Sequence, residues 1–366
     1  MTVDADQRFM TLALTLGRRG LGNAWPNPAV GAVVVKDGMV VGRGWTQPGG
    51  RPHAEVEALR RAGDAARGAT LYATLEPCSH HGKTPPCVDA IMAAGISRVV
   101  SALEDPNPRI AGQGHARLTS QGIAVATGVC VEEARRAHAG HIRRVRDGRP
   151  HVTLKIAMSA DGKAGLAGRK PAAITGEPAR ERVQLMRAMN DAVVTGIGTV
   201  LADDPQLTCR LPGMEGRSPV RVVLDSALRM PVQSKLAASA TRTLDWVFVD
   251  QNVRPDHEAE LTAAGVEVLR VPGANGRLDL TAVLRGLAAR GITRLMVEAG
   301  PILSAAFLGA DLVDEATLFR SSNRVGPDGI DALEGLPLTT LTQSTRLRMV
   351  ATEQIGADIL SLFERS

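Results

Sequence analysis

The chain has 366 residues, 44 % of them hydrophobic, and a formal net charge of +5, a composition typical of a globular protein with two or three domains. No apolar run approaches the roughly 20 residues that cross a bilayer, and residues 1–7 do not form a basic, apolar leader. Only nine aromatic residues are present, too few for the stacking platforms that bind single-stranded nucleic acid. The positive charge instead favours small anionic ligands such as phosphate esters. We therefore predict a cytoplasmic protein with no nucleic-acid or membrane partner.

The first half of the chain alternates between helical and strand-like patterns. Residues 4–20 carry apolar residues at helical spacing, and two β-branched runs flank Asp37 and Gly38, a strong hairpin signal. Further strands are predicted near residues 69–75, 97–103 and 123–127, and further helices near 53–62, 87–94, 110–121 and 131–144. This alternation predicts an α/β domain.

A basic run ending in Gly and Pro at residues 141–150 marks a boundary, so we predict domains at residues 1–147 and 148–366. The second domain has apolar runs typical of central strands. Its predicted strands span residues 151–158, 191–198, 220–225, 245–250, 266–271 and 294–300, and its predicted helices span 178–189, 279–290 and 301–309. The glycines of VVTGIGTVL lack the third glycine of the dinucleotide fingerprint, so a tight strand-to-helix turn explains them equally well.

Four residues in the first domain have the chemistry of a catalytic zinc site. His53, Cys78 and Cys87 supply one imidazole and two thiolates, which leaves a fourth tetrahedral position for water. Glu55 completes the H-x-E and P-C patterns of zinc deaminases, in which the glutamate moves protons. On a regular helix, however, Glu57 would lie closer to the His53 face than Glu55 does.

Two other interpretations of these residues stay open. His80 or His81 would complete a closed structural zinc site, which would leave Glu55 without a role. Alternatively, the residues are unrelated polar side chains.

The fragments PNPAVGAVVV, PHAE, TLEPCSHHGKTPPC, EDPNP and LADDPQLT, together with the eight residues between the two cysteines, resemble the bifunctional deaminase/reductase of riboflavin biosynthesis. The resemblance implies a cytidine deaminase-like three-layer domain followed by a dihydrofolate reductase-like α/β domain. It implies one zinc ion per deaminase domain, NADPH in the reductase domain, and a phosphorylated pyrimidine as substrate. The first step would remove the 2-amino group of a diaminopyrimidinone ribosylamine 5′-phosphate, and the second would reduce its ribosyl group to ribityl. Self-association through the reductase domain is also implied.

The resemblance assigns a role to individual residues. His53, Cys78 and Cys87 would bind zinc, and Glu55 would be the catalytic proton carrier. Substrate-binding residues would be Asn27, Lys83, Pro171, Arg187, Leu207, Arg210 and Glu298. Cofactor-binding residues would be Ala157, Ala173, Thr199, Asp203, Ser226, Gly300, Pro301, Ile302, Leu303, Ser304, Ala305 and Ala306.

The chain departs from the family pattern at three positions. Thr46 stands where the family often has a histidine, which puts recognition of the ribose phosphate in question. Pro171 and Ala173 replace a serine and a tryptophan that contact substrate and cofactor, and Trp246 is a candidate to fill the lost space.

Alternatives of two kinds follow. One is a deaminase of another nucleotide whose second domain has lost hydride transfer, and the other is a non-catalytic, zinc-stabilised binding module with four protein ligands on the metal. Independently of these alternatives, Lys155 and Asp161 would form a local ion pair or serve the site of the second domain, and we favour a structural role for them. Residues beyond about 310 are assigned only to sheet completion or subunit contacts.

Overall fold

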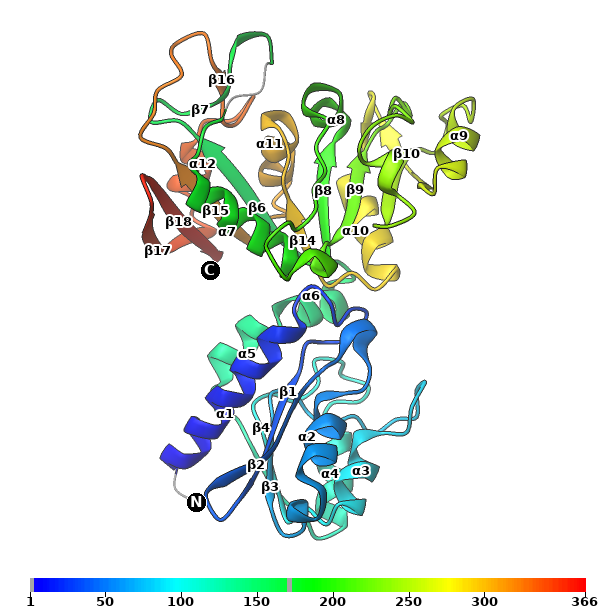
Figure 1. Cartoon of the computed structure of the whole chain (residues 1–366), viewed down its shortest axis with the longest axis vertical. Coiled ribbons are helices and arrows are strands. Elements are labelled where there is room, and N and C mark those ends of the chain that lie inside the picture. The colour runs from blue at the N-terminus through cyan, green and yellow to red at the C-terminus, as the bar shows by residue number, and fades with distance from the viewer. Residues whose placement is uncertain (1–2, 170–172) are drawn as a thin grey trace. The chain divides into compact units, whose positions relative to one another are not determined.

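The computed structural model describes residues 3–169 and 173–366, and the chain divides into two compact units, Met1–Arg149 and Pro150–Ser366 (Figure 1). The helices and strands of the N-terminal unit are α1 (Val3–Gly17), β1 (Gly31–Lys36), β2 (Met39–Trp45), α2 (Ala54–Ala62), β3 (Thr70–Ala73), α3 (Cys87–Ala93), β4 (Arg98–Ser101), α4 (Gln113–Ser120), β5 (Ala124–Thr127), α5 (Val131–Ala137) and α6 (Ala139–Asp147). Among the described helices, none is long and apolar enough to cross a membrane.

The N-terminal unit is a five-stranded sheet between two layers of helices, in the strand order β2-β1-β3-β4-β5 (Figure 1). Successive residues of a strand point to opposite faces, and β1 follows this rule. Val33 and Val35 pack with α1 and α5, whereas Ala32 and Val34 pack with α2, α3 and α4. The sheet is therefore buried on both faces, as the three-layer prediction requires.

The predicted hairpin at Asp37-Gly38 is confirmed, because both residues have positive φ values, 51° and 76°, and β1 pairs with β2 in antiparallel register. Two predicted helices have different bounds. The helix predicted at 110–121 begins only after Gly112, whose φ of 78° is left-handed. The helix predicted at 131–144 is divided into α5 and α6 at His138, whose buried ring bonds to Thr74 Oγ1 at 3.0 Å.

Helix α2 lies unusually close to strand β2 because of two glycines in the sequence MVVGRGW. A Cβ atom added to Gly42 would lie 2.2 Å from the Ala58 carbonyl oxygen, and one added to Gly44 would lie 2.3 Å from that of Ala54. No real side chain tolerates such contacts. Gly42 and Gly44 therefore set the depth at which α2, and the candidate site residues at its N-terminus, lie against the sheet.

The C-terminal unit is built on a nine-stranded sheet in the order β11-β10-β9-β8-β14-β6-β15-β18-β17. Its elements are β6 (His151–Met158), β7 (Lys163–Gly165), α7 (Glu177–Ala188), β8 (Ala192–Gly196), α8 (Ile197–Asp203), β9 (Val220–Leu224), β10 (Asp245–Asp250), α9 (Glu258–Ala263), β11 (Glu267–Val271), β12 (Gly273–Ala274), β13 (Arg277–Leu278), α10 (Leu280–Ala289), β14 (Arg294–Val297), α11 (Pro301–Gly309), β15 (Glu315–Arg320), β16 (Ile330–Asp331), α12 (Thr339–Thr342), β17 (Leu347–Ile355) and β18 (Asp358–Arg365).

The seven strands from β11 to β15 are parallel, and β18 and β17 add to the β15 edge in antiparallel register. The sheet completion predicted for the residues beyond 310 is thus confirmed. Alternate residues of β10 serve opposite faces: Val247 and Val249 belong to the core beneath α7 and α9, and Phe248 contacts Gly286 of α10. The hairpin β12–β13 and the short helix α9 were not predicted from the sequence.

We predict that Gly44→Ala destabilises the N-terminal unit by about 1–3 kcal/mol, the usual effect of forcing atoms into a packed interior. Urea unfolding followed by circular dichroism measures this. The matched control is Gly216→Ala, because no atom lies within 4 Å of a Cβ at that position. Equal unfolding midpoints for the two variants would contradict the packing argument.

Candidate active sites

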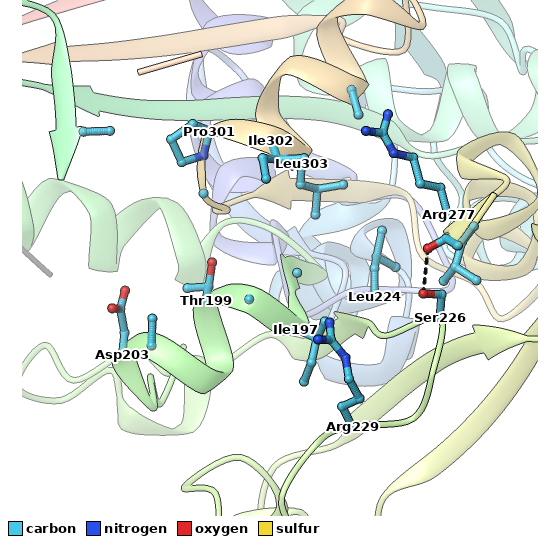
Figure 2. Close-up of a pocket in the computed structure, with 18 of the residues that line it drawn as sticks. Ile197, Thr199, Asp203, Leu224, Ser226, Arg229, Arg277, Pro301, Ile302 and Leu303 are labelled. Atoms are coloured by element: carbon cyan, nitrogen blue, oxygen red, sulfur yellow. Dashed lines mark hydrogen bonds between the residues drawn. The ribbon is translucent and has the colours of Figure 1, made fainter. Parts of the chain in front are cut away.

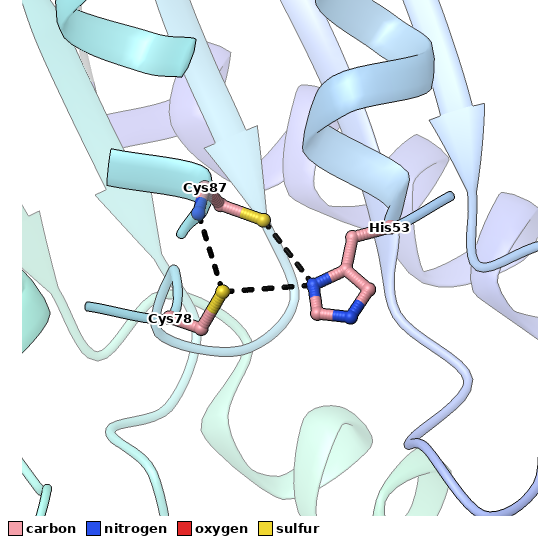
Figure 3. Close-up of side chains that lie close together, drawn as sticks. All are labelled: His53, Cys78 and Cys87. Carbon is pink, nitrogen blue, oxygen red and sulfur yellow. Dashed lines mark hydrogen bonds between the residues drawn. The ribbon is translucent and has the colours of Figure 1, made fainter. Parts of the chain in front are cut away.

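His53, Cys78 and Cys87 converge in the N-terminal unit, as Figure 3 shows. His53 Nδ1 lies 3.2 Å from Cys87 Sγ and 3.6 Å from Cys78 Sγ, and the three donor atoms all lie within 4.8 Å of one another. One imidazole and two thiolates at this separation suit a tetrahedral zinc ion. The site therefore fits zinc by the chemistry and the spacing of its donors.

The topology explains why residues so far apart in sequence meet. Strand β2 runs antiparallel to β1, and β1 runs antiparallel to β3, so β2 and β3 point the same way. The chain leaves the carboxyl end of β2 towards His53, and that of β3 towards Cys78. Cys87 opens α3, and its backbone N–H donates to Cys78 Sγ at 3.2 Å.

Hydrogen bonding makes the two thiols unequal. The Cys87 thiol donates to Cys78, and this bond, with a further contribution from His53, lowers the pKa of Cys78 to about 4. The same bond, together with burial, raises the pKa of Cys87. The lowered pKa of Cys78 favours its thiolate, which is the form that binds a metal ion.

Glu55, and not Glu57, lies at this cluster. His53 has extended backbone angles, φ −68° and ψ 159°, and only caps α2, so the helical rule that would direct Glu55 away from it does not apply. Glu55 is 97 % buried, and its carboxyl interacts with the Cys87 side chain. Burial raises the pKa of Glu55, although His53 partly opposes the shift. Glu57 instead pairs with Arg60 and Arg61, at 2.9 and 3.5 Å.

The structure does not support the closed structural zinc site. In the described part of the chain, the metal-competent group containing His53 has three members, and His80 and His81 are exposed outside it. Three protein ligands leave one tetrahedral position open, as catalytic zinc sites do.

Asn27 and Lys83 occupy different surroundings. The Asn27 side-chain nitrogen donates to the Gly50 carbonyl at 2.9 Å and lies 3.2 Å from His53 Nε2, so Asn27 borders the cluster. Lys83 is exposed in the loop between the two cysteines. Thr46 is buried and accepts a bond from the Val30 N–H at 3.0 Å, which gives this departure from the family pattern a structural role.

Glu76, beside the cysteine motif, organises the site but was not predicted. Its carboxylate accepts backbone N–H bonds from Asp105, Gly112 and Gly114 at 2.7–3.0 Å. These bonds hold the loop after β4 beside the Cys78 segment. Asp105, in the EDPNP fragment, interacts with Cys78 and His80, and burial raises its pKa. The available sequence signal was an acidic residue in LEPC, directly after an apolar strand pattern. A carboxylate buried there is costly without hydrogen-bond partners, so it predicts such partners.

Two adjoining cavities lie in the C-terminal unit, at the carboxyl ends of β6, β8, β9 and β14, where parallel α/β sheets bind ligands. The larger has a volume of about 590 Å³ and the smaller about 310 Å³. They share the wall residues Ala164, Thr199, Asp203, Gly300 and Pro301. Molecules in the two cavities would therefore meet at this wall.

Most of the predicted reductase residues line these cavities. The larger cavity contains the predicted cofactor residues Thr199, Asp203, Ser226, Gly300, Pro301, Ile302, Leu303 and Ala306. The smaller cavity contains Ala157, Ala173, Arg187, Leu207, Glu298 and Ser304. Ala305 and Arg210 line neither, and Pro171 lies outside the described residues. Trp246 is buried in β10 away from both cavities, so it does not replace the tryptophan that the family has near Ala173.

Arg187 and Glu298 form a buried ion pair in the wall of the smaller cavity. Arg187 Nε and Nη2 donate to the two Glu298 carboxylate oxygens at 2.8 and 2.7 Å, and Nη1 donates to the Thr208 carbonyl at 3.0 Å. Burial disfavours the charged carboxylate, but Arg187 outweighs this effect and holds the pKa of Glu298 below its usual value. Arg187 thus pairs with Glu298 in this structure, and its contact with the substrate phosphate stays a prediction.

Lys155 belongs to the same cluster. Its Nζ lies 3.9 Å from Glu298 Oε1, and burial lowers its pKa. The local ion pair between Lys155 and Asp161 is not formed. Asp161 instead accepts bonds from Ser159 Oγ and from the N–H groups of Val325 and Gly326. Lys155 therefore serves the cavity, and Asp161 has the structural role favoured above.

The two units match two sequence families. The family described as "Cytidine and deoxycytidylate deaminase zinc-binding region" matches residues 3–103, and "RibD C-terminal domain" matches residues 150–361. Together with the His/Cys/Cys cluster and the paired cavities, these matches define the class of protein: a zinc-type deaminase joined to a reductase.

Full-length relatives identify the family. The chain is 40 % identical to riboflavin biosynthesis protein RibD of Escherichia coli (strain K12), covering 97 % of this chain and 98 % of that protein. It is 38 % identical to RibD of Aquifex aeolicus (strain VF5) over the whole of both chains. The chain belongs to the RibD family, and it is a bifunctional deaminase and reductase of riboflavin biosynthesis.

Solved structures agree with this assignment. Acinetobacter baumannii RibD (form 1) superposes with a TM-score of 0.88 at 36 % identity and full coverage of both chains. The Thermotoga maritima deaminase/reductase gives a TM-score of 0.85 at 36 % identity, covering 100 % of this chain and 99 % of that one. The predicted fold class and the predicted resemblance are confirmed.

We predict that Cys87→Ser purifies with little zinc, whereas His80→Ala retains one zinc ion per chain, because only Cys87 belongs to the three-residue cluster. Atomic absorption of dialysed protein measures the metal content. A comparable loss of zinc in His80→Ala would instead restore the closed, four-ligand interpretation.

Proposed function

We propose that the N-terminal domain, residues 1–147, removes the 2-amino group of a diaminopyrimidinone ribosylamine 5′-phosphate by hydrolysis. The C-terminal domain, residues 148–366, then reduces the ribosyl group of the product to ribityl with NADPH. The observation that carries this proposal is the buried Glu55 carboxyl beside an open His53, Cys78 and Cys87 set in a chain that also holds two adjoining cavities.

The deamination exchanges an amino group for an oxygen atom. His53, Cys78 and Cys87 would hold a zinc ion, which when bound would lower the pKa of a water molecule at this site. Glu55 accepts a proton from the water at its carboxylate and passes it to the departing amino group, so that ammonia leaves. Burial raises the pKa of Glu55, which favours a carboxyl that can hold the proton between the two transfers. Asn27 borders the ring of His53 and would contact the pyrimidine.

The reduction requires the substrate and the cofactor to meet. The residues that line the larger cavity would hold NADPH, which when bound would supply a hydride. In the smaller cavity the C1′–ring oxygen bond of the ribosylamine would break to give an open imine, whose C1′ carbon would take the hydride while its nitrogen takes a proton from solvent. Glu298 and Lys155 present an acceptor and a donor to the ribose hydroxyls there, with Leu207 as an apolar wall. Arg187 acts through Glu298, whose carboxylate it orients with two bonds. Arg210, exposed nearby, remains the proposed phosphate contact, and Lys83 the proposed contact in the deaminase domain.

Two alternatives have less support. A reductase domain that has lost hydride transfer does not account for cavities that retain Thr199, Asp203 and Glu298 at their walls. A non-catalytic zinc module does not account for Glu55 beside a three-ligand cluster.

We further propose a homo-oligomer that assembles through the reductase domain. The cytoplasm is the proposed location, because all four cysteines are free thiols and the metal site requires two of them reduced.

A two-stage assay tests the proposal. Zinc-replete protein is given the diaminopyrimidinone ribosylamine phosphate, ammonia release is followed without cofactor, and NADPH absorbance is followed after its addition. We expect ammonia first and NADPH consumption afterwards. Ammonia release without NADPH consumption would support the deaminase alone and would overturn the proposed reduction.

Glu55→Gln tests the proton carrier. The amide cannot shuttle a proton, so we expect ammonia release to fall by about 10²–10⁴-fold while the zinc content stays at the wild-type level. Glu57→Gln is the matched control, because Glu57 pairs with Arg60 and Arg61 and should leave the rate nearly unchanged. Wild-type turnover in Glu55→Gln would refute the assignment.

A further inference from the structure

Charge is unevenly distributed around the larger cavity of the C-terminal unit. Ile197, Leu224 and Leu303 contribute to its mostly apolar wall. Among the described residues that line it, Asp203 is the only acidic one, and Arg229 and Arg277 are the only basic ones. Asp203 belongs to the wall shared with the smaller cavity, whereas Arg229 and Arg277 do not. Figure 2 draws the two arginines on the side of Ser226, away from Asp203.

Two turns of the chain bring Arg229 and Arg277 to the side of the larger cavity that lies away from Asp203. Arg229 follows β9, immediately after Leu228, whose φ of 53° turns the chain. Arg277 stands on the hairpin β12–β13, whose tip, Asn275-Gly276, has the paired positive φ values of a tight hairpin turn. Ser226 Oγ donates to the Gly276 carbonyl at 2.8 Å and so ties the hairpin to the end of β9 (Figure 2).

Both guanidinium groups remain available to a ligand. Arg229 is 56 % exposed, and its one ion pair in the described part of the chain is a long one, 3.9 Å from Nε to Asp225 Oδ1. Arg277 is exposed and has no hydrogen bond or ion pair to another described side chain. By contrast, Arg187 in the smaller cavity has its donors committed to Glu298 and Thr208.

The wall shared by the two cavities determines which end of a bound NADPH lies where. Its nicotinamide must reach the substrate through the shared wall at Thr199, Asp203 and Gly300, so its adenosine end must lie at the far end of the larger cavity. NADPH differs from NADH only by a phosphate on the adenosine 2′-oxygen. That dianion would be repelled near Asp203, but two arginines can hold it by charge-assisted bonds.

We propose that Arg229 and Arg277 bind the 2′-phosphate of NADPH, beside Ser226, and make the reductase select NADPH over NADH. The inference rests on the proposed reductase function and names the residues that determine its cofactor specificity. Sequence reasoning found Ser226 but missed the two arginines, because they lie 48 positions apart and meet only through the hairpin.

Calorimetry tests the proposal without any turnover. The probes are adenosine 2′,5′-bisphosphate and adenosine 5′-monophosphate, which differ only by the 2′-phosphate. We expect wild-type protein to prefer the bisphosphate, and Arg229→Met and Arg277→Met each to weaken its binding about 10- to 100-fold. Affinity for the monophosphate should change less than about threefold. Arg254→Met is the control, because Arg254 is exposed and lines neither cavity, yet its loss lowers the net charge equally.

Steady-state rates give a second readout. The ratio of kcat/KM for NADPH to that for NADH should fall about 10- to 100-fold in each variant, mainly through KM for NADPH, while NADH turnover persists and shows that the variant is folded. The proposal is overturned if the wild-type protein does not discriminate between the probes, or if the variants behave like Arg254→Met. Selective binding of the bisphosphate by a protein that never oxidises NADPH would uphold this site while refuting the proposed reduction.

Discussion

Parallel β-strands end at a common edge of their sheet, and both sites of this enzyme depend on that constraint. In the N-terminal unit β2, β3 and β4 point the same way, so the segments that follow them bring His53, Cys78 and Asp105 to one edge. In the C-terminal unit β6, β8, β9 and β14 end together, and the residues after them line the two cavities. The apolar strands thus form the stable cores, and the loops at one edge of each sheet carry the side chains of the sites.

Polar groups at these edges are buried only with partners. Glu76 is satisfied by backbone N–H groups of the loop beyond β4, and Glu298 by two bonds from Arg187. Removing one member of such a buried pair is expected to cost about 3–5 kcal/mol, because the other is left as an uncompensated charge. The same contacts that allow burial also fix the side chains in place. Rigidity at the cluster and in the smaller cavity is therefore a consequence of satisfying buried charge.

The departures from the family pattern are local in their effects. Thr46 uses its hydroxyl on the Val30 backbone and extends the β1–β2 pairing. Ala173 lies exposed at the smaller cavity, and Trp246 is committed to the core of β10, where it also stacks on Arg290. The smaller cavity is thus bordered by a methyl group at this position, and its lining includes the Arg187–Glu298 ion pair.

The sequence alone predicted the α/β class, nearly every central strand, and the identity of the zinc cluster, because hydrophobic periodicity and the His and Cys spacing are local properties of the chain. The motif pattern pointed to Glu55 while regular helix geometry favoured Glu57, and only the extended backbone of His53 removes the conflict. The sequence also predicted that Arg187 contacts the substrate phosphate and that Lys155 has a structural role. The tertiary fold adds a contact that these predictions did not include, because Glu298 lies 111 positions beyond Arg187 and reaches it only when β14 enters the sheet between β8 and β6. Which charges pair depends on distances between strands that are remote in sequence, and those distances exist only in the folded sheet.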